Sequence, residues 1–185
     1  MAGKNTHLVF VGDSQSKRML EQDVFHGYSF TDWTKPGATT EQILEHVRKE
    51  CQRGNKAPKN SLGIVWIGTN DVLQHKQYVF PGNFTKLVKF LKKVFKKMIF
   101  LLLPPLLRYP DPQTMVIIQR INKKIQSYQR DNVRILDLFA FCYRDGVIRA
   151  KYYEEVMGWN NRVDDIHLNS AAFRKIGAML KNFFP

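Results

Sequence analysis

Short apolar runs alternate with amphipathic, helical stretches along this chain of 185 residues. An apolar run between polar turns is typical of a buried strand, and apolar residues at helical spacing indicate a helix packed on one face. The pattern predicts strands at residues 7–11, 28–33, 62–67, 98–103 and 133–137, and helices at 16–22, 39 or 40–53, 83 or 85–97, 113–130 and 170–183. This alternation favours a three-layer α/β/α sandwich around a mainly parallel central sheet. We expect one domain over residues 1–185, with an irregular segment at 142–163.

Four polar motifs follow these runs or lie at the turns between them. They are Gly12-Asp13-Ser14, Gly37 in a Pro-Gly-Ala-Thr turn, Gly68-Thr69-Asn70-Asp71, and Asp164-Asp165-Ile166-His167. In open α/β sheets the ligand site lies outside the carboxyl ends of the strands. Ser14, Gly37 and Asn70 each follow a predicted strand, so we expect all three at that edge.

The residue types in these motifs supply the parts that serine acyl transfer needs. Ser14, between a strand and a helix, offers an exposed hydroxyl nucleophile near a helix N-terminus, and His167 offers a base. The side-chain amide of Asn70 and the backbone N–H groups of Ser14 and Gly37 offer donors for an oxyanion. The four motifs therefore indicate hydrolysis or transfer of an acyl group.

Two carboxylates are candidates for orienting the histidine. Asp164 lies three residues before His167, a spacing that lets its carboxylate reach the ring nitrogen that faces away from the serine. Asp165 is the second candidate, although the spacing favours Asp164. The histidines at positions 7, 26, 46 and 75 belong to no such motif, and we expect structural roles for them.

In this order, the four motifs resemble those of the SGNH, or GDSL-type, hydrolase superfamily, from residue 7 to residue 183. The resemblance implies an SGNH hydrolase-like, flavodoxin-like fold. It implies that Ser14 is the nucleophile, His167 the base and Asp164 its partner, with Ser14, Gly37 and Asn70 as the oxyanion hole. The implied activity is hydrolysis of carboxylic esters, acetyl or short acyl, through an acyl-enzyme. The substrate would be a small acyl ester or a lipid, and no cofactor is needed.

The chain departs from an average protein in its charge. Lys and Arg number 29 against 16 Asp and Glu, a formal net charge of +13. Such a surface attracts polyanions. Six lysines and no acid lie within residues 86–97, so RNA or single-stranded DNA is a candidate partner for Lys86, Lys89, Lys92, Lys93, Lys96 and Lys97. The simpler interpretation is a solvated face of an amphipathic helix.

Two lineages of the superfamily match a basic domain. One is the esterase domain in the first open reading frame protein of some LINE retrotransposons, and the other is the C-terminal domain of Oskar, which binds RNA and lacks the triad. The presence of Ser14, Asp164 and His167 favours the retrotransposon domain or an ordinary esterase. A non-catalytic RNA- or DNA-binding module on the same fold is the alternative function. Lys17 and Arg18 depart from the family pattern and place positive charge beside Ser14.

Several other classes of site find no support in the sequence. Cys51 and Cys142 have no metal-type or redox spacing, so we expect two free thiols in a reducing compartment. The sequence shows no metal-ligand spacing and no phosphate-binding glycine loop. The N-terminal apolar run is too short for a signal peptide, and the apolar stretch 98–107 is too short to span a bilayer. We therefore expect an intracellular protein, cytoplasmic or nuclear. Residues 143–159 are a candidate cover for the groove.

Overall fold

The computed structural model describes residues 6–153 and 164–184. Its central element is a five-stranded parallel sheet with the strand order β2-β1-β3-β4-β5. The strands are β1 (Leu8–Gly12), β2 (Phe30–Thr34), β3 (Leu62–Trp66), β4 (Lys97–Leu101) and β5 (Val133–Leu136). This is the flavodoxin-like order. The predicted three-layer fold with a parallel sheet is confirmed.

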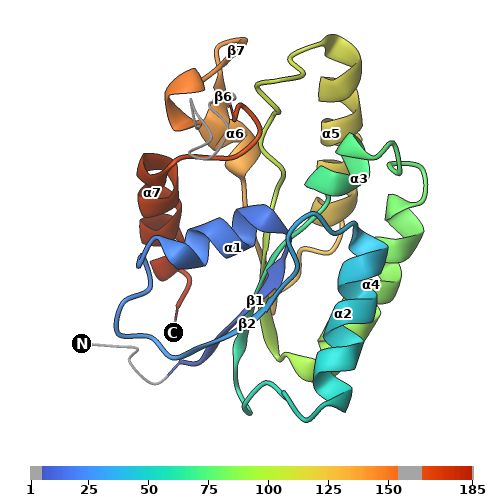
Figure 1. Ribbon diagram of the computed structural model, residues 1–185, viewed down its shortest axis with the longest axis vertical. Helices are drawn as coiled ribbons and strands as arrows, with labels where there is room; N and C mark the ends of the chain where they lie inside the picture. The colour runs from blue at the N-terminus through green and yellow to red at the C-terminus, as the bar shows by residue number, and fades with distance from the viewer. Residues whose placement is uncertain (1–5, 154–163, 185) are drawn as a thin grey trace.

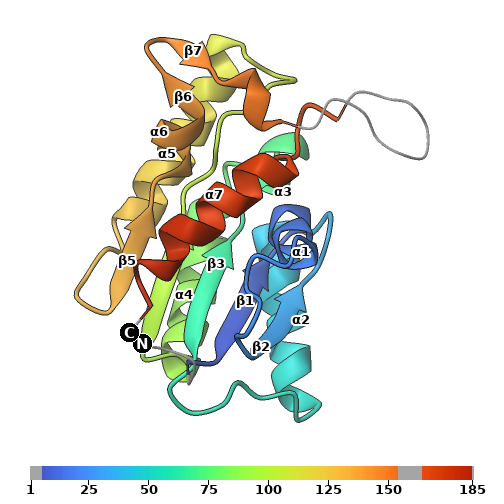
Figure 2. The ribbon, with the colours of Figure 1, turned by 90° about the vertical axis from the view of Figure 1, so that its left-hand side faces the viewer.

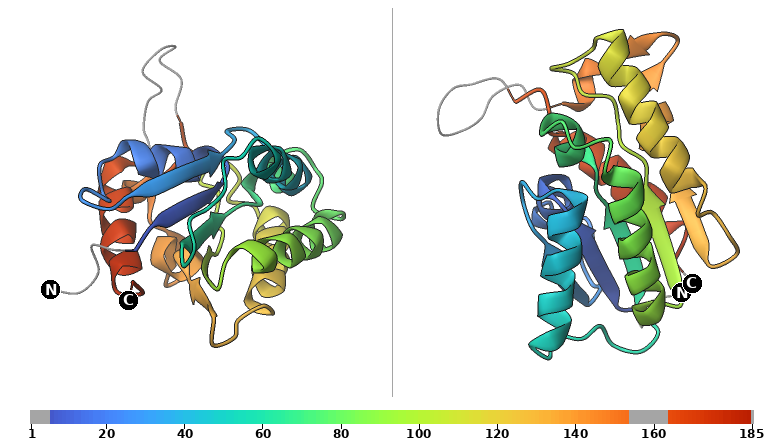
Figure 3. Two further views of the ribbon diagram at one scale, coloured as in Figure 1. Left: turned by 90° about the horizontal axis from the view of Figure 1, so that it is seen from below. Right: turned by 90° about the vertical axis from the view of Figure 1, so that its right-hand side faces the viewer.

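Helices cover both faces of the sheet. They are α1 (Ser14–Glu21), α2 (Thr40–Gln52), α3 (Thr69–Leu73), α4 (Phe80–Val94), α5 (Pro112–Gln126), α6 (Leu138–Cys142) and α7 (Ser170–Lys181). In Figure 1, α1 and α7 lie to the left of the sheet, and α2, α4 and α5 lie to its right. Right-handed connections produce this division. The connection from β1 to β2 runs toward one edge of the sheet and places α1 on one face. The connection from β2 to β3 runs back past β1 and places α2 on the other face. The right-hand view of Figure 3 shows α2 and α4 side by side.

The central strands β1 and β3 are buried along their whole length. Helices on both faces explain why these strands are continuous apolar runs instead of alternating ones. Gly12 ends β1 where the chain passes very close to β3. A Cβ atom at this position would collide with the side chain of Ser16 and the carbonyl oxygen of Trp66, so only glycine allows this approach.

The strand order reverses at β1, because β2 follows on one side of it and β3 on the other. In folds of this kind, ligands bind at such a reversal, beyond the carboxyl ends of the strands. The strand arrows point upward in Figure 2, which looks onto the face covered by α1 and α7. The site described below lies at that upper edge, after β1 and β3.

The helix expected to begin at residue 83 or 85 and to end at residue 97 has different limits. It is α4, which begins earlier because Pro81 fits the first turn of a helix, where its missing N–H is not needed. Phe95 leaves the helix in an extended conformation and is buried in the core, 3% exposed. Lys96 therefore lies beyond the helix and Lys97 begins β4. The expectation that all six lysines share one helix was wrong for these two.

Other elements also differ from the limits predicted for them. The helix expected at 113–130 is α5, which ends at Gln126. The short helices α3 and α6 were not expected. The segment expected to be irregular contains the hairpin β6 (Tyr143–Arg144) and β7 (Val147–Ile148) and a 3₁₀ turn, η1 (Ala150–Tyr152).

The proposed cover at 143–159 is only partly described, since residues 154–163 lie outside the described residues. An isolated antiparallel bridge joins Tyr153 to Leu168, across this segment. Among the described residues, no helix combines the length and the apolar character needed to span a membrane. Cys51 and Cys142 are both free, as the sequence predicted.

Candidate active site

Ser14 is the first residue of α1 and closely follows the end of β1. The preceding residue, Asp13, caps the helix, and its Oδ1 accepts a hydrogen bond from the backbone N–H of Gln15 at 3.0 Å. Helix N-termini present N–H groups without partners inside the helix. Ser14 therefore lies where a developing negative charge meets backbone donors.

His167 lies in the loop before α7 and connects Ser14 to a carboxylate. Its Nε2 is 2.8 Å from Ser14 Oγ, and its Nδ1 is 2.8 and 2.9 Å from the two oxygens of Asp164. The backbone N–H of His167 also donates to Asp164, at 3.1 Å. The structure thus brings together Ser14, His167 and Asp164 in one hydrogen-bonded chain, although Ser14 and His167 are 153 residues apart in sequence.

Asp165, the second candidate carboxylate, points elsewhere. Its Oδ1 is 2.6 Å from Nε of Arg108. Asp164 is 2% exposed and makes the contacts with the imidazole. The geometry therefore selects Asp164 as the partner of His167.

The titration of these groups suits a neutral histidine beside an ionised carboxylate. Burial lowers the pKa of His167, and the positive charge of Arg18 lowers it further, against the hydrogen bond with Asp164 that raises it. Burial acts to raise the pKa of Asp164, but the hydrogen bonds from His167 and the charge of Arg18 outweigh it, so that pKa lies below its usual value. A neutral imidazole near pH 7 can accept a proton from Ser14.

A cavity of ≈ 420 Å³ opens beside Ser14 and His167, with Gly37 and Asn70 in its lining. Nδ2 of Asn70 is buried and has no hydrogen-bond partner within the described residues. A buried donor without a partner is rare, because leaving it unpaired costs about 1–3 kcal/mol. The amide of Asn70 is therefore available to a bound group. All three residues predicted for the oxyanion hole, Ser14, Gly37 and Asn70, line this cavity.

The turn that carries Gly37 is tied to the helix that carries Asn70. Gly37 has φ +73°, a conformation that glycine adopts without strain. Its carbonyl oxygen accepts a hydrogen bond from Gln74 at 3.1 Å. Thr40 donates to Asp71 from both its backbone N–H and its hydroxyl, at 2.9 and 2.8 Å. These bonds hold Gly37 and Asn70, the two candidate oxyanion donors, in place relative to one another.

Gln15 is a positioning residue that the sequence analysis missed. It is fully buried, and its side chain donates to the carbonyl of Ile166 at 2.9 Å and accepts from the N–H of Leu168 at 3.2 Å. These two residues flank His167 on both sides. The residue next to Ser14 thus holds the loop that carries the histidine. A polar residue at a buried helix position was the available signal, but helix periodicity alone did not separate it from a solvated one.

The remaining predicted groups lie away from this site. Lys86, Lys89, Lys92, Lys93, Lys96 and Lys97 are all exposed. His7 bonds Ser29 and Thr31 through its two ring nitrogens, consistent with a structural role. Within residues 6–153 and 164–184, no cluster of His, Cys, Asp and Glu could hold a metal ion.

Comparison with known proteins identifies the family of the chain. Residues 8–180 match the family described as GDSL-like Lipase/Acylhydrolase. The chain belongs to this family. Family membership supports hydrolase activity in general. Among curated proteins, no relative matches the sequence.

Solved structures of GDSL proteins share the fold. A member of the lipolytic G-D-S-L family from Veillonella parvula DSM 2008 superposes with a TM-score of 0.74 at 16% identity, covering 97% of this chain and 98% of that one. A GDSL-like lipase from Bacteroides thetaiotaomicron VPI-5482 gives 0.68 at 20% identity, with 99% and 91% covered. The C-terminal domain of the Drosophila Oskar protein gives 0.75 at 16% identity, with 94% and 85% covered. The GDSL architecture therefore extends over nearly the whole chain.

Proposed function

We propose that this GDSL-family protein is a serine esterase that hydrolyses carboxylic esters. The observation that carries the proposal is the placement of His167, whose Nε2 is 2.8 Å from Ser14 Oγ while its Nδ1 bonds Asp164. A hydroxyl becomes a nucleophile when a base within hydrogen-bond reach can take its proton. The unpartnered amide of Asn70 in the same cavity supports acyl chemistry specifically.

The reaction would follow from these contacts in order. Ser14 Oγ attacks the ester carbonyl as His167 Nε2 takes its proton, and Asp164 stabilises the imidazolium that forms. The carbonyl oxygen becomes an oxyanion, held by the N–H groups of Ser14 and Gly37 and by Asn70 Nδ2. His167 then gives the proton to the leaving alcohol, which leaves an acyl group on Ser14. Water, deprotonated by His167, releases the acid and restores the serine.

Covalent labelling with a fluorophosphonate tests this function, because the reagent needs an activated serine. We expect one adduct per chain on Ser14, with loss of acetyl-ester hydrolysis. The Ser14→Ala variant should neither be labelled nor hydrolyse the ester. Ser127→Ala, a change at an exposed serine just beyond the end of α5, should leave both labelling and hydrolysis intact. Labelling that is absent from the wild-type protein, or turnover that survives Ser14→Ala, would contradict the mechanism.

We also propose that the basic surface binds RNA or single-stranded DNA. The ammonium groups of Lys92 on α4 and Lys124 on α5 lie 5.8 and 5.1 Å from the ring centroid of Tyr128. Positive charge therefore continues from α4 to the neighbouring helix, which supports a surface for a polyanion over a single solvated stripe. If this is the sole function, the protein binds nucleic acid and Ser14 is not labelled.

A further inference from the structure

The cavity beside Ser14 adjoins others, because neighbouring cavities share lining residues. Leu73, at the end of α3, lines the Ser14 cavity and also a second cavity of ≈ 340 Å³. That second cavity shares Gln77, Gln113 and Ile117 with a third, of ≈ 750 Å³. The three spaces follow one another from the nucleophile toward α5, and we call them together the edge groove.

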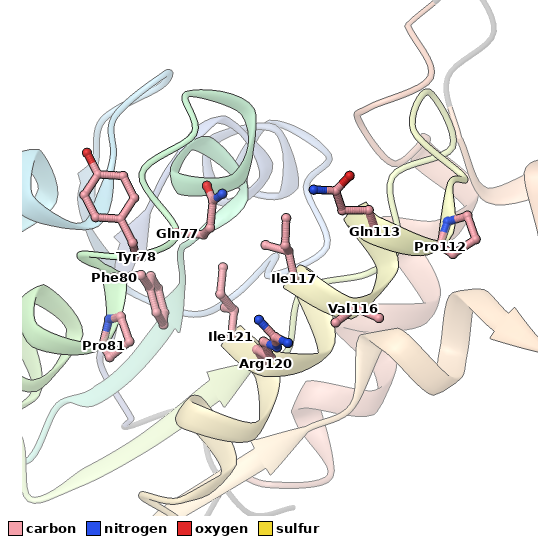
Figure 4. Close-up of a pocket in the computed structure, with 10 residues that line it drawn as sticks. All are labelled: Gln77, Tyr78, Phe80, Pro81, Pro112, Gln113, Val116, Ile117, Arg120 and Ile121. Carbon is pink, nitrogen blue, oxygen red and sulfur yellow. The ribbon is translucent and has the colours of Figure 1, made fainter.

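The far end of the edge groove is mainly apolar, with Gln77, Gln113 and Arg120 as its polar lining, and lies between two segments of the chain. Figure 4 shows Tyr78, Phe80 and Pro81 on one side and Val116 and Ile117 of α5 on the other. An acetyl group on Ser14 would lie within the first cavity, whereas a longer acyl chain would extend past Leu73 toward the next one.

Exposed apolar side chains gather along the edge groove. Tyr78 is 77% exposed and Val116 44%, and both line the third cavity. Tyr109 is 43% exposed and lines the second. Exposed apolar residues that cluster around a hollow mark a binding site for an apolar ligand, whereas single ones are ordinary. The far cavity therefore suits an apolar group, whereas the cavity between it and Ser14 also presents polar side chains, among them His75, Asp111 and Thr114.

The direction of the groove identifies which part of an ester it would hold. His167 must protonate the leaving alcohol, so the alcohol lies on the side of His167 and α7. The edge groove leaves the site on the opposite side, past Asn70 and Leu73 on α3, and α3 contacts α5. The acyl part of the ester is thus the part that faces the groove.

From this succession of adjoining cavities we infer that the protein prefers esters of medium or long unbranched acyl chains, with the chain bound in the edge groove past Leu73 and against Ile117. The inference rests on the proposed esterase function and departs from the sequence-based expectation of acetyl or short acyl esters. Each methylene that enters the groove raises kcat/KM by up to about fourfold, the factor that corresponds to burying one CH₂ group.

The test compares p-nitrophenyl octanoate with p-nitrophenyl acetate. We expect a ratio of kcat/KM, octanoate over acetate, of at least about tenfold in the wild-type protein, and a fall of at least about tenfold in that ratio for Ile117→Trp, which fills the groove. The matched control is Gln126→Trp, an exposed position on the same helix outside the three cavities. If Ile117→Trp does not fold by circular dichroism, Val116→Trp replaces it.

The outcomes separate the groove from the chemistry. Acetate hydrolysis with a ratio near one, or a ratio that the two tryptophan variants change equally, overturns the groove and leaves the esterase intact. If no ester is hydrolysed and Ser14 is not labelled, the esterase function fails. Calorimetric titration with octanoate then shows whether the groove binds an acyl chain. Octanoate binding that is absent, or that Ile117→Trp leaves unchanged, overturns it, whereas binding abolished only in Ile117→Trp supports it.

Discussion

Nη2 of Arg18 lies 3.0 Å from Oδ2 of Asp164, the carboxylate that also contacts the ring of His167. The same carboxylate thus faces two cationic partners whenever the imidazole is protonated. Arg18 comes from the helix that begins with Ser14, four residues away, so one turn of α1 places a charge behind the base. Arg18, one of the two basic residues that follow Ser14 in the sequence, thus has Asp164 as its partner.

Arg18→Gln should move the acidic limb of the pH–rate profile to higher pH. Burial is the main cause of the low pKa of His167, and the nearby positive charge of Arg18 adds to it. Removing that charge makes the imidazolium easier to form, so the histidine stays protonated, and inactive as a base, up to a higher pH. The measurement is kcat/KM against pH, with Arg174→Gln, an exposed arginine on α7, as the control. A limb that moves to lower pH would show that Arg18 acts through structure.

Asp164→Asn should reduce kcat far more than Asp165→Asn. An amide at 164 favours the wrong tautomer of His167, an effect of about 10⁴-fold in a serine protease. Asp165 contacts Arg108 instead of the histidine, so we expect a change of only a few-fold. Steady-state kinetics of the two variants, with melting temperatures to verify folding, provide the comparison. A larger loss in Asp165→Asn would exchange the two roles.

Asn70→Ala should lower kcat by about 10²–10³-fold, the usual effect of removing one oxyanion donor. Its Nδ2 has no partner among the described residues, so little of the effect should arise from reduced stability. Labelling of Ser14 by a fluorophosphonate should slow in parallel, because the phosphonyl oxygen uses the same donors. A decrease in kcat no larger than about tenfold, with folding intact, would remove Asn70 from the oxyanion hole.

The stability of Asp13→Asn should increasingly exceed that of the wild-type protein as the pH rises. Burial raises the pKa of Asp13 to about 7 from 3.8, and the charge of Asp71 adds to the shift. The folded state therefore holds this proton more tightly, and stability is lost as the pH rises through the interval between these values. Asparagine has no such proton, so its advantage should grow by up to about 4 kcal/mol between about pH 4 and pH 8. Urea unfolding at both pH values measures it; a pH-independent difference would mean an ordinary pKa.

Replacing Lys89 and Lys93 with Gln should weaken RNA or single-stranded DNA binding and reduce its dependence on salt. Both are exposed and lie one turn apart on α4. Removing one phosphate contact should flatten the log–log slope against salt by about 0.7. The control with the same change in charge is Lys56→Gln with Lys59→Gln, in an exposed loop. Fluorescence anisotropy at several salt concentrations measures both. Equal decreases in affinity for the two pairs would indicate a response to net charge and not a surface on α4.

The strands and the edge they share were predictable because each feature is local. An apolar run such as β3 and the polar residues after it are adjacent in sequence, and topology then gathers the ends of parallel strands at one edge. This reasoning placed Ser14 and Asn70 correctly. The choice between Asp164 and Asp165 was left to a spacing argument, and the contact of Asp165 with Arg108, 57 residues away, supplied what spacing could not.

Other features depended on contacts between distant residues and were therefore missed. The end of α4 is set by burial of Phe95, which no helix propensity describes. The side chain of Gln15 has two partners that lie 151 and 153 residues away, on either side of His167. The helix α3 has only five residues, too few for a periodic pattern to appear. For Phe95 and Gln15, tertiary contacts outweigh the local preference of the sequence.

The bridge between Tyr153 and Leu168 has a consequence for evolvability. The segment it spans starts and finishes at neighbouring points of the fold, while Gln15, from another helix, determines where His167 lies. Lengthening a segment whose ends are already held together adds only about 0.6 kcal/mol for each doubling. Because Gln15 holds the backbone on both sides of His167, residues added to this segment ahead of Asp164 need not move the base away from the nucleophile. A lineage could lengthen the chain at this place and keep its chemistry.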